Sequence, residues 1–281
     1  TLDSEAYTLP ADLQSPDGQS LANGMTFDDP IILERFDALL DWLAPHFMAR
    51  GGWAISIGNE VDLRLEDHPE DEASIVGFVS SGVVYLNRIA PDLGGTVTLS
   101  NDALQSQPTL VSSLMQVVDL ACFNFYGNLQ APDFSYVARD LDDRLAVAGE
   151  LEVILQEVGY PAGYEDQPSN IQSSPEEQQA FFEAVIGKMA MEKRLRVAIV
   201  FQLLDWSAWL TDLFLQYYAD AGLPQGWLEL IEEQLRTIGL CRWEDSSSRP
   251  AWDTFLNGVR QFSIANEVSG AAGQAGSGLP R

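Results

Sequence analysis

Short apolar runs rich in β-branched residues recur along the chain, and stretches with helical periodicity separate them. The runs cover residues 53–57, 96–99, 117–125, 152–155 and 197–204. Strands of a parallel sheet have this continuous apolar character, because helices cover both of its faces. The alternation of strand and helix therefore predicts an α/β fold with a parallel sheet.

The stretches between these runs carry local signals of helix ends. Asp29 has the side chain of an N-cap, Pro30 follows at the first helical position, and Gly51-Gly52 ends the apolar pattern. A second helix is expected over about 70–89. Later helices are expected over 133–148, 175–194, 224–238 and near 250–262.

The chain is strongly acidic, and this limits its partners. Of its 281 residues, 15 are Lys or Arg and 42 are Asp or Glu, which gives a formal net charge of −27. Such a charge repels nucleic acids and anionic membrane surfaces, so neither is an expected partner, and it favours a neutral ligand over an acidic one. It also suits a salty or extracellular setting, because a large net charge keeps a protein soluble, and this slightly favours a secreted or periplasmic location.

Length and composition predict one large domain over residues 1–263. Residues 264–281 are rich in Gly, Ala and Ser and are expected to form a flexible tail. Cys122 and Cys241 are too few for a disulfide framework or a thiolate metal site. No apolar run is long enough to span a membrane.

Two carboxylates follow two of the predicted strands. Strand 53–57 leads into Asn59-Glu60, and strand 152–155 leads into Gln156-Glu157. Catalytic groups of barrel enzymes lie at this end of their strands. In glycoside cleavage, one carboxyl group protonates the departing oxygen and the other attacks or stabilises the oxocarbenium-like centre. A separation of about 5–5.5 Å predicts retention of configuration, and about 6.5–9.5 Å predicts inversion.

Three motifs together resemble those of strands four, six and seven in the large clan of retaining glycoside hydrolases with a (β/α)8 TIM barrel. They are Ile57-Gly58-Asn59-Glu60-Val61, Asn124-Phe125-Tyr126 and Gln156-Glu157-Val158-Gly159-Tyr160-Pro161. Residues 197–206 resemble the eighth strand. The two Glu motifs are similar to those of the β-1,3-glucanase-like and endo-galactanase-like branches, and the resemblance covers about residues 1–263.

The resemblance implies a role for each matching residue. Glu60 is expected as the general acid/base and Glu157 as the nucleophile. Asn59 is expected to bond the sugar 2-hydroxyl, and Tyr126 to orient Glu157. The other expected substrate contacts are Asn124, Tyr160 and Trp206, of which the tryptophan offers an apolar platform under a sugar ring. Each of these residues also has a purely structural interpretation, as an ion pair, a satisfied strand end or a core side chain.

The implied barrel is incomplete at its N-terminus, with strands three to eight present. If strand 53–57 is the fourth, only residues 1–7 remain for the third, and the first two β/α units have no counterpart. The chain is then a fragment of a longer product, or self-association or a second chain completes the barrel, or the sheet has an open edge.

The resulting hypothesis is hydrolysis of β-glycosidic bonds in a neutral polysaccharide or oligosaccharide, with retention and without metal or cofactor. The acidic run 66–72 lacks the ligand spacing of a calcium loop, and neither His46 nor His68 lies in a zinc-binding pattern. Two alternatives stay open. One is a non-catalytic glycan-binding or scaffold protein derived from such a barrel, and the other is a transglycosylase that uses the same carboxylates.

Overall fold

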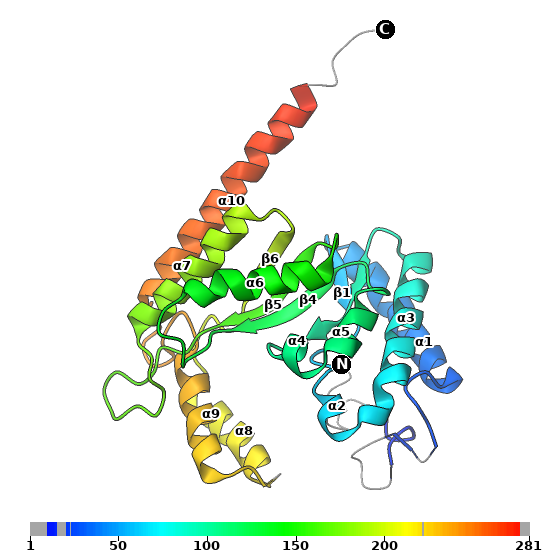
Figure 1. Ribbon diagram of the computed structural model, residues 1–281, viewed down its shortest axis with the longest axis horizontal. Helices are drawn as coiled ribbons and strands as arrows, with labels where there is room; N and C mark the ends of the chain where they lie inside the picture. The colour runs from blue at the N-terminus through cyan, green and yellow to red at the C-terminus, as the bar shows by residue number, and fades with distance from the viewer. Residues whose placement is uncertain (1–9, 16–20, 23, 221, 276–281) are drawn as a thin grey trace. The chain divides into compact units, whose positions relative to one another are not determined.

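The protein is an α/β fold with parallel strands, shown in Figure 1 as a computed structural model. The structure describes residues 10–15, 21–22, 24–220 and 222–275. The chain divides into two compact units, with unit 1 spanning 1–125, 142–158 and 194–199, and unit 2 spanning 126–141, 159–193 and 200–281. The single domain over 1–263 stays a prediction.

The strands form two small sheets. In the first, β1 (Ala54–Ser56) pairs in parallel with β2 (Gly94–Thr96). The second has the order β3-β4-β5-β6, in which β3 (Thr98–Leu99) pairs in parallel with β4 (Ala121–Tyr126). The remaining strands are β5 (Val153–Gly159) and β6 (Leu195–Val200).

The helices that precede β4 in the chain belong to unit 1, and among them α3 packs against β2. The longest, α1 (Pro30–Met48) and α3 (Glu72–Ile89), pack against each other (Figure 1). The short ones are α2 (Arg64–Asp67), the 3-10 helix η2 (Pro69–Asp71), α4 (Ala103–Ser106) and α5 (Pro108–Leu114). One core cluster joins α1, β1 and α3 through Leu40, Ile55 and Leu86, and a second joins β4 and β5 through Leu120, Cys122 and Ile154.

Helix α6 (Ser135–Ala148) follows β4 and crosses from unit 2 into unit 1. Arg144, in its unit 1 part, is buried, and its guanidinium lies 5.8 Å from the ring centre of Phe123 and 4.8 Å from that of Phe125 in β4. Arg144 also donates to the backbone oxygen of Asn101 at 2.7 Å. Charge and aromatic packing thus hold the end of α6 on the strand.

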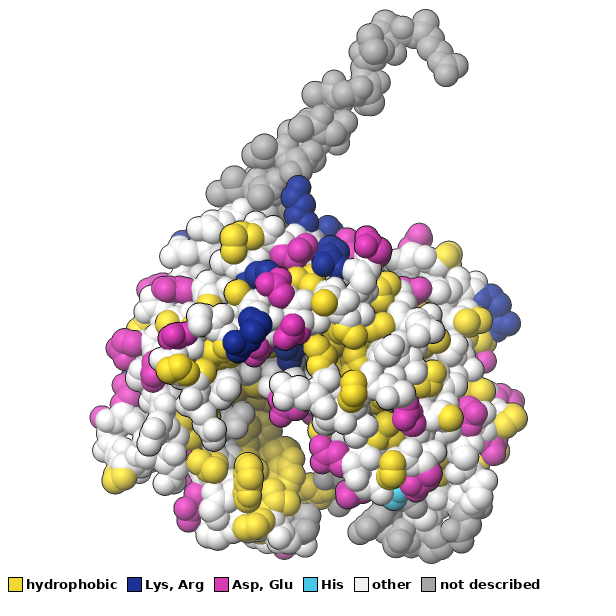
Figure 2. All heavy atoms as spheres, viewed as in Figure 1, with side chains coloured by type: hydrophobic (Ala, Val, Ile, Leu, Met, Phe, Trp, Pro, Cys, Tyr) yellow, Lys and Arg dark blue, Asp and Glu magenta, His cyan; other side chains and the backbone are white. Residues whose placement is uncertain are grey.

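Unit 2 contains two helix pairs. Helix α7 (Pro175–Met191) packs against α10 (Pro250–Ala275), and α8 (Ala208–Asp220) packs against α9 (Gln225–Thr237). Figure 2 shows apolar side chains on the surface of α8 and α9. The exposed ones include Trp209, Leu213 and Trp227.

Several sequence predictions need correction at their boundaries. The run 96–99 is divided between β2 and β3, which pair with different strands, and β5 continues to Gly159, so Glu157 lies inside the strand and not after it. Helix α8 was missed. Helix α10 continues to Ala275, the flexible tail expected over 264–281 stays a prediction, and residues 276–281 lie outside the described part. The third strand expected within residues 1–7 also lies outside it.

Candidate active site

The segment that carries Asn59 and Glu60 continues the pairing of β1 beyond its last residue. Ile57 N donates to Thr96 O at 2.7 Å, and Thr98 N donates to Gly58 O at 2.9 Å. These bonds hold the end of β1 beside the start of β3. Asn59 and Glu60 therefore begin from a fixed strand end, although both side chains are only partly buried.

A buried carboxylate fixes the chain on the other side of Glu60. Asp62 is 1% exposed, and its two carboxylate oxygens accept from the backbone N of Ser100 at 2.8 Å and from the Ser100 hydroxyl at 2.5 Å. Val61, which lies between Glu60 and Asp62 in the sequence, is fully buried. The residues before and after Glu60 are thus both tied to the segment that contains β3.

The backbone of Glu60 is strained. Its φ of 48° lies in the left-handed region, which within the described residues only one other non-glycine residue, Ser246, enters. This conformation costs an L-residue roughly 1–2 kcal/mol. Strained residues gather at functional sites, where the surrounding structure holds them in place. The conformation is therefore a second reason, besides the motif, to place Glu60 in a site.

Asn124 in β4 contacts the carboxyl group of Glu60 directly. Its Nδ2 donates to Glu60 Oε1 at 2.9 Å, and the asparagine is fully buried. Asn124 Oδ1 has no hydrogen-bond partner among the described residues. Leaving a buried acceptor unsatisfied costs about 1–3 kcal/mol, so other contacts must offset this cost to keep the Asn124 amide in its position. The bond restricts the rotation of the Glu60 carboxyl group.

Gln156, which the sequence analysis did not assign to the site, connects Asn59 to the sheet. Its Nε2 donates to Asn59 Oδ1 at 3.2 Å, and its Oε1 accepts from the Thr98 hydroxyl at 2.6 Å. The only sequence signal was its place directly before Glu157. Its partners lie 97 and 58 residues away in the chain, so no local pattern could have identified them.

Glu157 is the next residue of β5 and is partly buried. Burial raises the pKa of the neighbouring Cys122 thiol to about 12, a hydrogen bond with Thr98 opposes this shift, and the charge of Glu157 adds to it. Glu157 therefore acts electrostatically on the strand that also carries Asn124. Unit 1 contains Asn59, Glu60, Asn124 and Glu157. Their catalytic and binding roles stay predictions.

The other predicted site residues belong to unit 2. The ring of Tyr126 lies edge-on to Phe201, with 5.6 Å between ring centres, and Trp206 lies edge-on to Phe214 at 5.1 Å. Trp206 lies beyond the end of β6 and is partly buried. The roles of Tyr126 and Trp206 also stay predictions.

Tyr160 requires a correction, because the structure places it in the core. It is 3% exposed and stacks on Phe181 with 5.3 Å between ring centres, while Phe134 contacts it edge-on at 5.4 Å. Burial raises the pKa of its phenol to about 12. The side chain therefore packs in an aromatic cluster and does not present a surface to a sugar.

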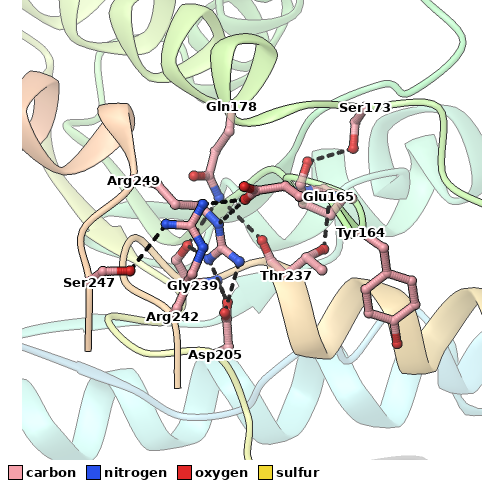
Figure 3. Close-up of polar contacts among 12 residues, drawn as sticks. Tyr164, Glu165, Ser173, Gln178, Asp205, Thr237, Gly239, Arg242, Ser247 and Arg249 are labelled. Carbon is pink, nitrogen blue, oxygen red and sulfur yellow. Dashed lines mark hydrogen bonds and ion pairs between the residues drawn. The ribbon is translucent and has the colours of Figure 1, made fainter. Parts of the chain in front are cut away.

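A buried ion pair in unit 2 was also missed. Arg249 donates from Nη1 to Asp205 Oδ1 at 2.8 Å and from Nη2 to Oδ2 at 2.9 Å, and Figure 3 shows the two groups face to face. Gly239 N donates to Asp205 Oδ1 at 2.8 Å. Arg242 pairs with Glu165 in the same network. Asp205 is therefore a structural residue, which fixes the backbone directly before Trp206.

In the ranges that the structure describes, no group of three or more His, Cys, Asp or Glu side chains is arranged to hold a metal ion. No helix of the described residues combines the length and the apolar character that crossing a membrane requires.

Comparison with known proteins gives the fold its wider context. No family model and no curated protein sequence matches the chain. Its structure is similar to that of a GH5_18 protein from Streptomyces cattleya in complex with Manβ1-4GlcNAc, with a TM-score of 0.62 and 18% identity over 90% of this chain. A GH5_18 from Bifidobacterium longum subsp. infantis gives a TM-score of 0.61 and 16% identity over 90% of this chain. Bacteroides uniformis β-glucuronidase 2, covalently bound to an aziridine, gives a TM-score of 0.53 and 13% identity over 78% of this chain.

The chain has the fold of a partial TIM barrel. It spans 58% and 57% of the length of the two GH5_18 chains and 25% of the β-glucuronidase chain. These similarities support the fold class predicted from the strand and helix pattern. At such low identity they do not assign an activity.

Proposed function

We propose that the chain hydrolyses β-glycosidic bonds of a neutral glycan with retention of configuration. The observation that carries the proposal is the placement of Glu60. Its backbone is strained at a strand end, and buried Asn124 holds its carboxyl group at 2.9 Å. A carboxyl group fixed in this way matches the preorganised acid that glycoside cleavage needs.

In the proposed reaction, Glu60 protonates the departing glycosidic oxygen while Glu157 attacks the anomeric carbon. A covalent glycosyl-enzyme forms, and Glu60, now ionised, removes a proton from the water that hydrolyses it. Asn59 donates to the sugar 2-hydroxyl. The mechanism needs no metal or organic cofactor.

Charge guides the choice of substrate. The formal charge of −27 disfavours a uronate, which would carry its own negative charge into an acidic protein. The motifs favour the β-1,3-glucanase-like and endo-galactanase-like branches of the clan, and the disaccharide bound by the Streptomyces cattleya protein is also neutral. The first substrates to test are β-1,3-glucan, β-1,4-galactan and Manβ1-4GlcNAc, with an aryl β-glucuronide as the charged comparison.

The test measures release of reducing sugar by the wild-type chain and by Glu157→Ala, Glu60→Ala and Glu150→Ala. Glu150 is exposed in the same part of the chain and serves as the control. We expect Glu157→Ala to lower turnover on the order of a thousandfold or more, and Glu150→Ala to have no effect. Azide should rescue Glu157→Ala with formation of an α-glycosyl azide, and Glu60→Ala with a β-glycosyl azide. If both site variants keep near-full activity, the assignment is wrong.

Two alternatives predict different results in the same assays. A glycan-binding or scaffold protein would give a binding isotherm without sugar release. A transglycosylase would give products longer than the substrate. The proposal also includes a protein partner, either a second copy or another chain that completes the barrel, and sedimentation velocity over a range of concentrations tests for self-association.

A further inference from the structure

The side chain of Gln156 links the strand end that carries Asn59 to the strand that carries Thr98. Thr98 Oγ1 donates to Gln156 Oε1 at 2.6 Å, and Cys122 Sγ lies 3.7 Å from the same oxygen. On its other side, Gln156 Nε2 donates to Asn59 Oδ1 at 3.2 Å. All four residues belong to unit 1.

Thr98 is well placed to fix this arrangement. It is fully buried, and its hydroxyl lies 2.7 Å from the hydroxyl of Ser56, which in turn donates to Gly58 O at 2.8 Å. A hydroxyl held on several sides has few other orientations. The Gln156 amide, anchored on such a group, has its Oε1 directed at Thr98 and its Nε2 directed at Asn59.

The orientation of Asn59 follows from this. Because Oδ1 of Asn59 accepts from Gln156, the amide nitrogen on the opposite side of the group is presented as the donor. A sugar 2-hydroxyl bound at Asn59 would then meet an N–H donor and not an oxygen. Such a bond strengthens as charge develops at the adjacent anomeric centre.

We infer that Gln156 is a positioning residue that holds the Asn59 amide with its nitrogen toward the substrate 2-hydroxyl. The inference rests on the proposed function for its substrate, but its geometric part concerns Gln156, Thr98 and Asn59 alone. The hydrogen bonds that run from Thr98 through Gln156 to Asn59 then favour sugars that have a 2-hydroxyl, equatorial or axial, over their 2-deoxy analogues.

The kinetic test compares an aryl β-glycoside with its 2-deoxy analogue. We expect Gln156→Leu to lower kcat/KM about tenfold for the 2-hydroxy substrate, which corresponds to about 1.4 kcal/mol and is the size of one hydrogen bond, and to leave kcat/KM for the 2-deoxy substrate unchanged. In the background of Asn59→Ala, Gln156→Leu should have no further effect. Equal losses on both substrates, or additive losses with Asn59→Ala, would indicate mere structural damage and overturn the inference.

Thr98 provides a second set of variants. Thr98→Val removes the hydroxyl that anchors Gln156 and should reproduce the loss on the 2-hydroxy substrate, whereas Thr98→Ser keeps the hydroxyl and should retain activity. The matched control is Thr211→Val, because Thr211 is also fully buried but its hydroxyl has no hydrogen-bond partner in the described structure. Gln156→Glu tests the direction of the hydrogen bond between Gln156 and Asn59, since a carboxylate still accepts from Thr98 but cannot donate to Asn59. Full activity of Gln156→Glu would contradict the assigned direction.

A readout without turnover separates this inference from the proposed function. The side-chain NH2 signals of Asn59 in ¹⁵N-labelled protein should shift and exchange faster in Gln156→Leu and Thr98→Val than in the wild type and Thr211→Val. If these signals respond but the wild type releases no sugar, the positioning role stands and the proposed function fails. If the signals of Asn59 are the same in all four proteins, the positioning role is wrong whatever the activity.

Discussion

The ion pair between Arg249 and Asp205 permits a quantitative test of stability. The side chains are 4% and 2% exposed, and two hydrogen bonds of 2.8 and 2.9 Å join them. Arg249→Leu leaves the Asp205 carboxylate buried without its cation. Breaking a buried pair from one side costs about 3–5 kcal/mol, so we expect a loss of this size in the free energy of unfolding at pH 8.

The loss should depend on pH in a defined direction. Burial raises the pKa of Asp205 above its ordinary 3.8, and the hydrogen bond from Arg249 opposes the shift. Without Arg249 the pKa rises further. For a group whose folded-state pKa is raised, stability is greatest below the unfolded pKa and falls as pH rises toward the folded pKa. The cost of Arg249→Leu should therefore be smaller at pH 5 than at pH 8.

Urea unfolding followed by tryptophan fluorescence at both pH values measures this cost. The double variant Asp205→Asn/Arg249→Leu removes both charges, so it should recover most of the loss and show little added pH dependence. Arg236→Leu is the control, because Arg236 pairs with an exposed Glu244 at 3.4 Å, and its loss should stay within about 1 kcal/mol. A cost of less than about 1 kcal/mol for Arg249→Leu at pH 8, or a double variant no more stable than the single one, would contradict the assignment of a buried ion pair.

Three further predictions concern other parts of the chain. Buried Glu233 accepts from the backbone N–H groups of Tyr164, Asn170 and Ile171. Glu233→Leu should therefore cost on the order of 3 kcal/mol of stability and make residues 164–171 more sensitive to protease. The control Glu229→Leu, at an exposed position, should have neither effect. A Cβ at Gly239 would clash with the backbone N of Asp205, so Gly239→Ala should lower the urea midpoint. Gly187 has open space around it in α7, so Gly187→Ala should add about 0.5–1 kcal/mol of stability and raise the midpoint. Cys122 is buried with a pKa raised to about 12, so at pH 8 a thiol reagent should modify partly buried Cys241 first and Cys122 only on unfolding; equal rates would refute this.

Local chemistry explains which elements could be predicted from the sequence. Asp29 caps α1 by accepting from Ile31 N at 3.1 Å, and Ser174 caps α7 by accepting from Glu177 N at 3.2 Å. In both helices a proline occupies the first turn. Such signals lie within three residues of the helix end. Helix α8 was missed because its apolar residues are spread around the helix, and several of them are exposed.

The candidate site shows where this kind of prediction stops. The motifs indicated Asn59, Glu60 and Glu157, because each lies beside an apolar strand in the sequence. They did not indicate Gln156 as the partner of Asn59, and they indicated Asn124 as a substrate contact and not as the partner of Glu60, since these contacts join residues 58 to 97 positions apart. Tyr160 was misassigned for the same reason, because its place in the motif does not reveal the aromatic side chains of other elements that bury it.

The strain at Glu60 connects the stability of unit 1 to its proposed chemistry. A left-handed glutamate is unfavourable by itself, and the contacts that offset its cost come from Asp62 through Ser100 and from Asn124. Those contacts exist only when β3 and β4 lie beside the end of β1. The carboxyl group is therefore fixed by the folded sheet and not by its local sequence. It follows that substitutions that loosen β3 or β4 should disturb the orientation of Glu60 before they unfold the unit.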